Sequence, residues 1–99
     1  MLVVTGSVVA KPDHFEELFA LSQEHVTRSR TEPGCLSHAV YRDPENPLRL
    51  VFVEEWADRM ALLVHFGVQG SRDFAKSIKG MAAEPPELNV YEAERVPFP

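Results

Sequence analysis

The segment Leu50–Phe66, LVFVEEWADRMALLVHF, decides the fold because it joins a strand pattern to a helix pattern. It opens with a continuous apolar run, Leu50–Val53, which is typical of a buried strand. Side chains two residues apart lie on the same face of a strand. One face of this predicted strand therefore carries Leu50, Phe52, Glu54 and Trp56.

A helix pattern follows this strand directly. Asp58 is predicted to be its N-cap, because an Asp side chain accepts hydrogen bonds from the free N–H groups of a first helical turn. The inward stripe of the helix would carry Ala61, Leu62, His65 and Phe66. The segment thus directs a carboxylate, an indole and an imidazole towards an apolar interior. Because buried polar groups cost free energy unless they are paired, we expect a pocket that uses them.

Composition narrows the class of protein. A chain of 99 residues, 44% of them apolar, is expected to form one domain. The net charge of −5 argues against nucleic acid or an anionic membrane as the main partner, and no stretch approaches the ~20 apolar residues of a membrane span. The N-terminus lacks the basic region of a signal peptide, and the single Cys35 fits a reducing compartment, so a cytoplasmic location is expected. No metal-ligand spacing or nucleotide-binding fingerprint is present, and neither a metal nor a cofactor is expected.

The remaining patterns complete a βαββαβ order with a split second helix. We expect strands at 2–10, 35–42, 48–56 and 88–93, helices at about 13–30, 58–66 and 71–81, a loop at 67–70 and a C-terminal arm at 94–99. This order is the ferredoxin-like split βαβ, an α+β fold with a four-stranded antiparallel sheet.

Local signals set the ends and faces of the other helices. Asp13 and Glu16 have the spacing of a capping box, and Ser71 is placed to cap the last helix. Arg28 is assigned to the solvated face of the first helix. The inner stripe of that helix would carry Phe15, Leu18, Ser22, His25, Val26 and Ser29.

Both faces of the predicted sheet are apolar. In the third strand, Val51 and Val53 lie opposite Leu50 and Phe52. An antiparallel sheet with one solvated face should alternate apolar and polar residues. The helices of one chain cover only one face, so we expect a second copy to cover the other, giving a homodimer with sheet packed on sheet.

Two motifs carry a family resemblance. Glu32-Pro33-Gly34-Cys35, followed by Glu54-x-Trp56-x-Asp58-x-x-Ala61-Leu62-x-x-His65, resembles the antibiotic biosynthesis monooxygenase (ABM) family of dimeric α+β barrels. The resemblance implies cofactor-independent oxygenation of quinols or anthrones, as in some members of the family. Other members isomerise small signalling molecules, degrade haem or have no assigned activity. Haem degraders carry an Asn on the first strand, where this chain has Gly6-Ser7-Val8, which weakens the haem interpretation.

The candidate catalytic residues are His65, His25 and Glu54. Reaction of a singlet organic molecule with triplet dioxygen is spin-forbidden, but a deprotonated hydroquinone or phenol can pass one electron to dioxygen. His65 or His25 could remove the proton, since histidine titrates near neutral pH. Glu54 is expected to contact one of these two histidines and orient it. The residues expected to sandwich a flat substrate are Trp56, Phe52, Phe66 and Phe74.

Each of these residues also has a structural interpretation. His65 and Glu54 could be a buried hydrogen-bonded pair, Trp56 a core residue and His25 a satisfied core histidine. His38 shares a strand face with Leu36 and Val40, or lies at the dimer interface. Free cysteine usually behaves as a small hydrophobe, as expected for Cys35.

The sequence therefore predicts a monooxygenase that needs no cofactor, with a small aromatic or quinol-like substrate and dioxygen as its partners. Two alternatives remain open. One is an isomerase that moves a proton on a small carbonyl compound, and the other is a dimeric barrel that binds a ligand without catalysis.

Overall fold

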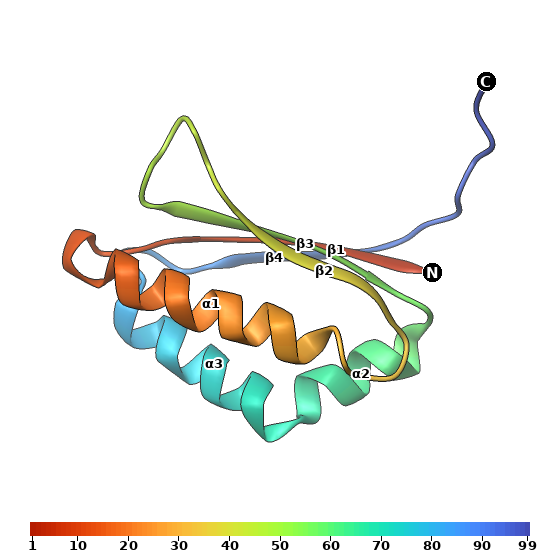
Figure 1. Cartoon of the computed structure of the whole chain (residues 1–99), viewed down its shortest axis with the longest axis horizontal. Helices are drawn as coiled ribbons and strands as arrows, with labels where there is room; N and C mark the ends of the chain where they lie inside the picture. Colours follow the sequence, from red (N-terminus) through yellow and green to blue (C-terminus); the bar gives the residue numbers. More distant parts are fainter.

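The computed structural model describes residues 1–99 and consists of one antiparallel sheet with helices packed on one of its faces (Figure 1). The strands are β1 (Leu2–Val9), β2 (Cys35–Arg42), β3 (Arg49–Trp56) and β4 (Glu87–Glu92), in the spatial order β2-β3-β1-β4. The helices are α1 (Phe15–Ser29), α2 (Arg59–Gly67) and α3 (Gln69–Met81), and a short 3-10 turn, η1 (Pro12–His14), precedes α1. The predicted α+β class and element order are confirmed.

Strand register places the predicted face of β3 in the interior. Residues Val4, Gly6 and Val8 of β1 pair with Glu54, Phe52 and Leu50 of β3. Paired residues share a face, so the two central strands form a single inner surface. The buried side chains of β3 are Leu50, Phe52, Glu54 and Trp56, as predicted.

The apolar core consists of two clusters. The larger is formed by Val8, Ala10, Phe15, Leu18, Val26, Leu50 and Phe52. The smaller is formed by Leu2, Val4, Trp56 and Leu62. Glu54 lies on β3 between Phe52 of the larger cluster and Trp56 of the smaller one, so a buried carboxylate interrupts the core.

The inner stripe of α1 is confirmed, since all six predicted residues are buried. Two of them are serines, Ser22 and Ser29. Their hydroxyl groups donate to the carbonyl oxygens of Leu18 and His25, at 2.7 and 2.6 Å. Each serine satisfies its own polar group on the helix, so α1 can pack closely without a partner from the sheet.

The start of α2 is confirmed and two other helix starts are corrected. Asp58 Oδ1 accepts from the backbone N–H of Ala61 at 2.8 Å, as its N-cap role requires. The proposed box of Asp13 and Glu16 is wrong, because neither η1 nor α1 has a side-chain cap. Ser71 is not a cap either, since α3 already begins at Gln69.

The predicted loop at 67–70 is absent. Val68 alone separates α2 from α3. It is the C-cap of α2 and the N-cap of α3, and its extended backbone changes the direction of the helix. Helix α2 therefore continues almost directly into α3, and Ser71 lies inside α3 with its side chain buried. No helix of the protein is both long and apolar enough to cross a membrane.

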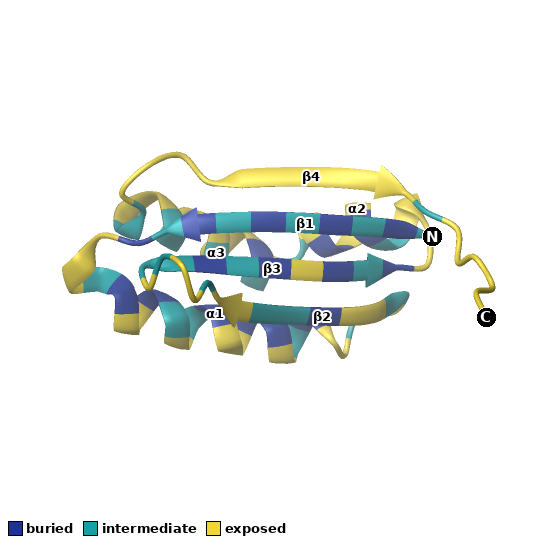
Figure 2. Ribbon diagram, turned by 90° about the horizontal axis from the view of Figure 1, so that it is seen from above, coloured by how far each residue is buried: buried dark blue, intermediate teal, exposed yellow.

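The sheet face opposite the helices is uncovered in the single chain (Figure 2). Alternation and register place Val3, Tyr41, Val51, Val53 and Tyr91 on this face. Strand β4 is exposed along its whole length. Residues 94–99 run away from the sheet (Figure 1).

Candidate functional site

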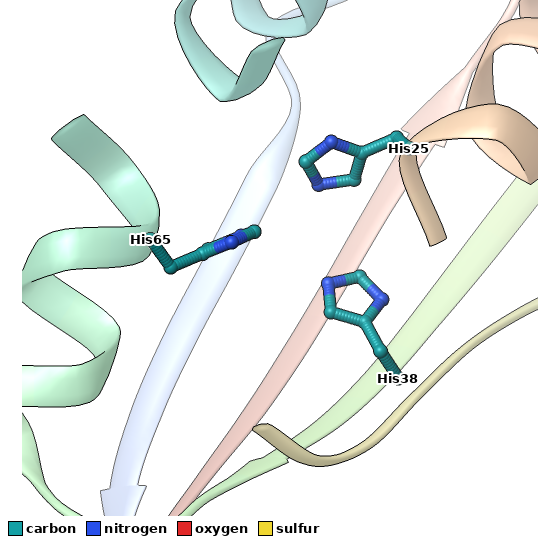
Figure 3. A group of neighbouring side chains, drawn as sticks. All are labelled: His25, His38 and His65. Atoms are coloured by element: carbon teal, nitrogen blue, oxygen red, sulfur yellow. The ribbon is translucent and has the colours of Figure 1, made fainter. Parts of the chain in front are cut away.

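Three buried histidines meet beneath the sheet. Figure 3 shows the imidazoles of His25, His38 and His65 converging from α1, β2 and α2. One nitrogen of each ring lies within 4.8 Å of a nitrogen of the other two. All three side chains are almost fully buried. Polar groups at such a position need partners, and the partners of each ring set its chemistry.

The partner of His65 is Glu32, which lies in the turn after α1. The Nδ1 atom of His65 is 2.8 Å from Glu32 Oε1, and the Ser71 hydroxyl lies at the longer distance of 3.5 Å from the same nitrogen. An ionised carboxylate can only accept, so Nδ1 carries the proton. The Nε2 atom of a neutral His65 therefore has a free lone pair and can take up a proton.

His25 has the opposite tautomer. The guanidinium Nη2 of Arg28 lies 2.6 Å from His25 Nδ1, and because a guanidinium can only donate, Nδ1 is the acceptor. The proton of a neutral His25 is then on Nε2. Burial, followed by the neighbouring His38, His65 and Arg28, lowers the pKa of His25 to about 3. His25 is thus a neutral hydrogen-bond donor, and its ring is stacked on Phe74 with centroids 4.2 Å apart.

Glu54 contacts His38, and the prediction that it contacts His65 or His25 is wrong. His38 and Glu54 are cross-strand neighbours of β2 and β3, with His38 Nε2 3.2 Å from Glu54 Oε1. The same oxygen accepts from the indole Nε1 of Trp56 at 2.9 Å. Burial acts to raise the pKa of Glu54, but the contacts with His38 and Trp56 outweigh it and the pKa is lowered.

His38 is the least satisfied member of the cluster. Although Glu54 is close, neither ring nitrogen of His38 has a well-aligned hydrogen bond. The 3.2 Å contact between His38 and Glu54 is therefore close but poorly aligned. Strand pairing places His38 on the inner face, and it is almost fully buried, whereas Leu36 is exposed beyond an irregularity in the β2–β3 pairing.

A cavity of about 220 Å³ opens beside the cluster, between the sheet and the helices. His25, His65 and Glu54 contribute polar groups to its wall. The apolar wall contains Phe52, Phe66, Phe74, Ile78 and Leu88. An engineered cavity of about 150 Å³ is large enough for benzene, so this space suits one or two fused rings.

The structure separates the predicted substrate-binding aromatics into two groups. Phe52, Phe66 and Phe74 line the cavity, and Phe66 is partly exposed. Trp56 does not line the cavity. It is fully buried behind the cluster, with its ring centroid 4.5 Å from that of His65, and it supports the imidazole from the side of the core. A larger depression of about 450 Å³, between Met1, Asp58 and Glu94, is open to solvent and contains no histidine.

Three members of the site, Glu32, Arg28 and His38, are not predicted as site residues from the sequence. Arg28 was assigned to a solvated face, but it is only half exposed and reaches back three residues to His25. The i, i+3 spacing of these two residues was a usable signal. Burial, followed by Glu32 and Glu54, raises the pKa of the Cys35 thiol, which disfavours the nucleophilic thiolate.

Known proteins resemble this chain in both sequence and structure. Residues 1–77 match the family model described as antibiotic biosynthesis monooxygenase. The protein sll1783 of Synechocystis sp. is 37% identical over 91 residues, which are 92% of this chain and 62% of that protein. The chain therefore spans less than two thirds of this relative.

Solved structures extend the comparison to the whole fold. A crystal structure of an antibiotic biosynthesis monooxygenase is 28% identical, with a TM-score of 0.89 over 96% of this chain and 100% of that one. Rv0793 from Mycobacterium tuberculosis, 24% identical, has a TM-score of 0.89 over 96% of both chains, and this likeness concerns the fold alone.

Proposed function

Since the chain belongs to the antibiotic biosynthesis monooxygenase family, we propose that it is a monooxygenase that oxidises a small aromatic or quinol-like substrate with dioxygen and without a bound cofactor. The observation that carries this proposal is the pair of opposite histidine tautomers at one cavity. His65 offers a lone pair there, and His25 offers an N–H group.

His65 is the general base. Its Nε2 atom takes the proton of a phenolic hydroxyl group, and Glu32 stabilises the imidazolium that forms. Glu32 takes the place that the sequence suggested for Glu54.

His25 is the hydrogen-bond donor to the phenolate oxygen. Because its pKa is about 3, the ring is not protonated to the cation at neutral pH, and the neutral imidazole that remains keeps one N–H group. A neutral imidazole that donates to a developing oxyanion stabilises the anion without giving up a proton.

The apolar walls of the cavity bind the aromatic ring of the substrate. Phe52 and Phe74 hold the ring and exclude water, which strengthens the interactions with the anion.

The phenolate passes one electron to dioxygen, and the two radicals recombine to form a carbon–oxygen bond. The protonated His65 returns its proton to the peroxide anion, which gives a hydroperoxide. Loss of the hydrogen on the same carbon to His65 as a proton then forms a carbonyl group while the O–O bond breaks, and the departing hydroxide takes up that proton, so that one oxygen atom stays in the product and the other leaves as water. All four electrons that reduce dioxygen come from the substrate.

The working unit we propose is a homodimer. Val51, Val53 and Tyr41 form an apolar surface on the sheet face that no element of the same chain covers. A second copy packed on this face would remove it from water and leave the cavity, on the other side of the sheet, accessible.

The same pair of tautomers favours one further candidate function. A base and a neutral donor at one carbonyl group are also the requirements for enolisation, so a proton-transfer isomerase is the second candidate.

The test is oxygen uptake with hydroquinone and with a fused-ring phenol under ¹⁸O₂. The expected result is enzyme-dependent uptake with one ¹⁸O atom in the product. Oxygen uptake that forms hydrogen peroxide and leaves no ¹⁸O in the organic product contradicts a monooxygenase. Exchange of solvent deuterium into a carbonyl compound without oxygen uptake supports the isomerase. Binding without either reaction leaves a ligand-binding barrel.

A further inference from the structure

We propose that His25, His38 and His65 form a binding site for a divalent late first-row metal ion such as Zn²⁺ or Co²⁺, in competition with the side chain of Arg28. Imidazole nitrogen is a preferred ligand of these ions. The sequence shows no ligand spacing because the three residues come from α1, β2 and α2, and only the fold brings them together.

The geometry lies within reach of tetrahedral coordination. The three nitrogens are within 4.8 Å of one another. With metal–nitrogen bonds of 2.0–2.1 Å, the nitrogens of a tetrahedral site are about 3.3 Å apart. Rotations of the side-chain torsions that move each ring by about 1 Å would close this difference. No well-aligned hydrogen bond of His38 has to be broken when its ring moves.

Two carboxylates lie next to the ligands. Glu32 fixes the proton of His65 on Nδ1 and leaves Nε2 for a metal, and Glu54 lies beside His38. A carboxylate on the ring nitrogen that does not bind the metal, as Glu32 is on Nδ1 of His65, orients the imidazole and increases its basicity. Their two negative charges also offset the cost of burying a dication.

Arg28 opposes metal binding in two ways. Its positive charge repels a cation, and its hydrogen bond places the His25 proton on Nε2, the atom that would bind the metal. Arg28 therefore has to leave before the metal can bind. The structure allows this exchange, because the side chain is half exposed and rests against Gly70, where a Cβ atom would be 2.5 Å from the guanidinium carbon.

The metal would lie at the wall of the cavity. His25 and His65 both line it, so the fourth coordination position would face the space available to a small molecule. Three histidines with one open position are typical of exchangeable sites rather than closed structural ones. A metal there would occupy Nε2 of His65, so loading should inhibit the proton transfer proposed above.

The experiment is a titration of chelator-treated protein with Co²⁺, followed by the visible absorption of the ion, with Zn²⁺ added to displace it. The expected result is an intense tetrahedral spectrum that saturates at one Co²⁺ per chain. His38→Gln should abolish the spectrum, whereas His14→Gln, the same change at the histidine outside the cluster, should leave it unchanged. Circular dichroism of each variant verifies folding.

Two variants that keep all three ligands make the proposal falsifiable even if His38→Gln does not fold. Arg28→Met should bind Co²⁺ more tightly, by about tenfold or more, because a positive charge is removed. Glu32→Gln should bind it about 10–100-fold more weakly. An octahedral spectrum, loss of binding in His14→Gln, or weaker binding by Arg28→Met would overturn the site. No substrate is present in this titration, so its outcome is independent of whether the protein is a monooxygenase.

Discussion

Glu32 and His65 are joined by a 2.8 Å hydrogen bond that links the turn after α1 to the last part of α2. The two residues come from the two sequence motifs of the family, which are separated along the chain but adjacent in the fold. This contact, rather than one with Glu54, gives His65 the protonation pattern of a base.

The first prediction concerns the charge of Glu32. Glu32→Gln keeps a hydrogen-bond acceptor but no longer stabilises the imidazolium. We expect the kcat of quinol oxidation to fall about 10²-fold, with a much smaller change in KM, since the residue acts through His65. Steady-state oxygen uptake measures both. Glu24→Gln, on the exposed face of α1, is the matched control, and an equal loss there would show that Glu32 has no special role.

The second prediction concerns His65, the proposed base. His65→Ala should reduce quinol oxidation by roughly 10²–10⁴-fold, the usual range for general base catalysis. Ligand binding should weaken far less, because Phe52 and Phe74 still line the cavity. The rate should recover as the pH rises through the pKa of the substrate phenol. If His65→Ala is fully active and His25→Ala is not, the base is on α1.

The third prediction concerns assembly. Val53→Asp introduces a charge into the uncovered sheet face, where Val53 is 39% exposed. It should weaken the free energy of association of the proposed dimer by several kcal/mol. Leu63→Asp, on an exposed face of α2, should leave the assembly unchanged. Analytical ultracentrifugation separates the two variants. A wild-type protein that sediments as a monomer at micromolar concentration rules the dimer out.

The fourth prediction concerns the pH dependence of folding. His25 has a pKa of about 3 in the folded protein, against 6.5 for the free side chain, so the unfolded chain binds the proton more strongly. The stability due to the neutral ring is present above pH 6.5 and is lost as the pH falls from there towards 3. The expected loss is about 1.4 kcal/mol per pH unit from this residue.

Urea unfolding between about pH 7 and 5 measures this slope, a window that lies above the titration range of Glu54, whose pKa is lowered. His25→Gln should remove that contribution, whereas His14→Gln should keep it. Equal slopes for the wild type and His25→Gln would show that His25 is not held neutral by the fold.

The fifth prediction concerns the turn that carries Glu32. Gly34 has a φ of 82°, and a Cβ atom at this position would be 2.5 Å from the Cβ of Ala61. Gly34→Ala should therefore destabilise the protein by about 2 kcal/mol or more. Gly80→Ala, in the open part of α3, should be neutral or stabilising by up to about 1 kcal/mol. Thermal melts compare the two.

A double variant isolates the steric part of this effect. Ala61→Gly alone costs about 1 kcal/mol because it places a glycine in α2, so it is the reference for the double variant. In this background the clash is absent and only the backbone strain remains, so Gly34→Ala should cost less stability than it does in the wild type. An equal cost in both backgrounds would show that Gly34 is required for its conformation alone.

The sequence by itself determined the α+β class, the order of the elements and the inner faces of β3 and α1. These are local properties, because apolar periodicity along one segment specifies both the type of element and the face that it buries. Asp58 was identified as a cap for the same reason, since a cap and its N–H partner are three residues apart. Ser71 failed as a cap because packing let α2 continue into α3, with a single residue between them.

Only the tertiary structure decided the partners of the polar groups. Glu54 contacts His38 rather than His65, because the register of β2 against β3 places these two residues opposite each other, and neither strand alone reveals that register. Glu32 reached His65 across 33 residues, and Arg28 fixed the tautomer of His25. A buried imidazole becomes an acid, a base or a ligand according to what its other nitrogen touches, and that contact exists only once the chain has folded.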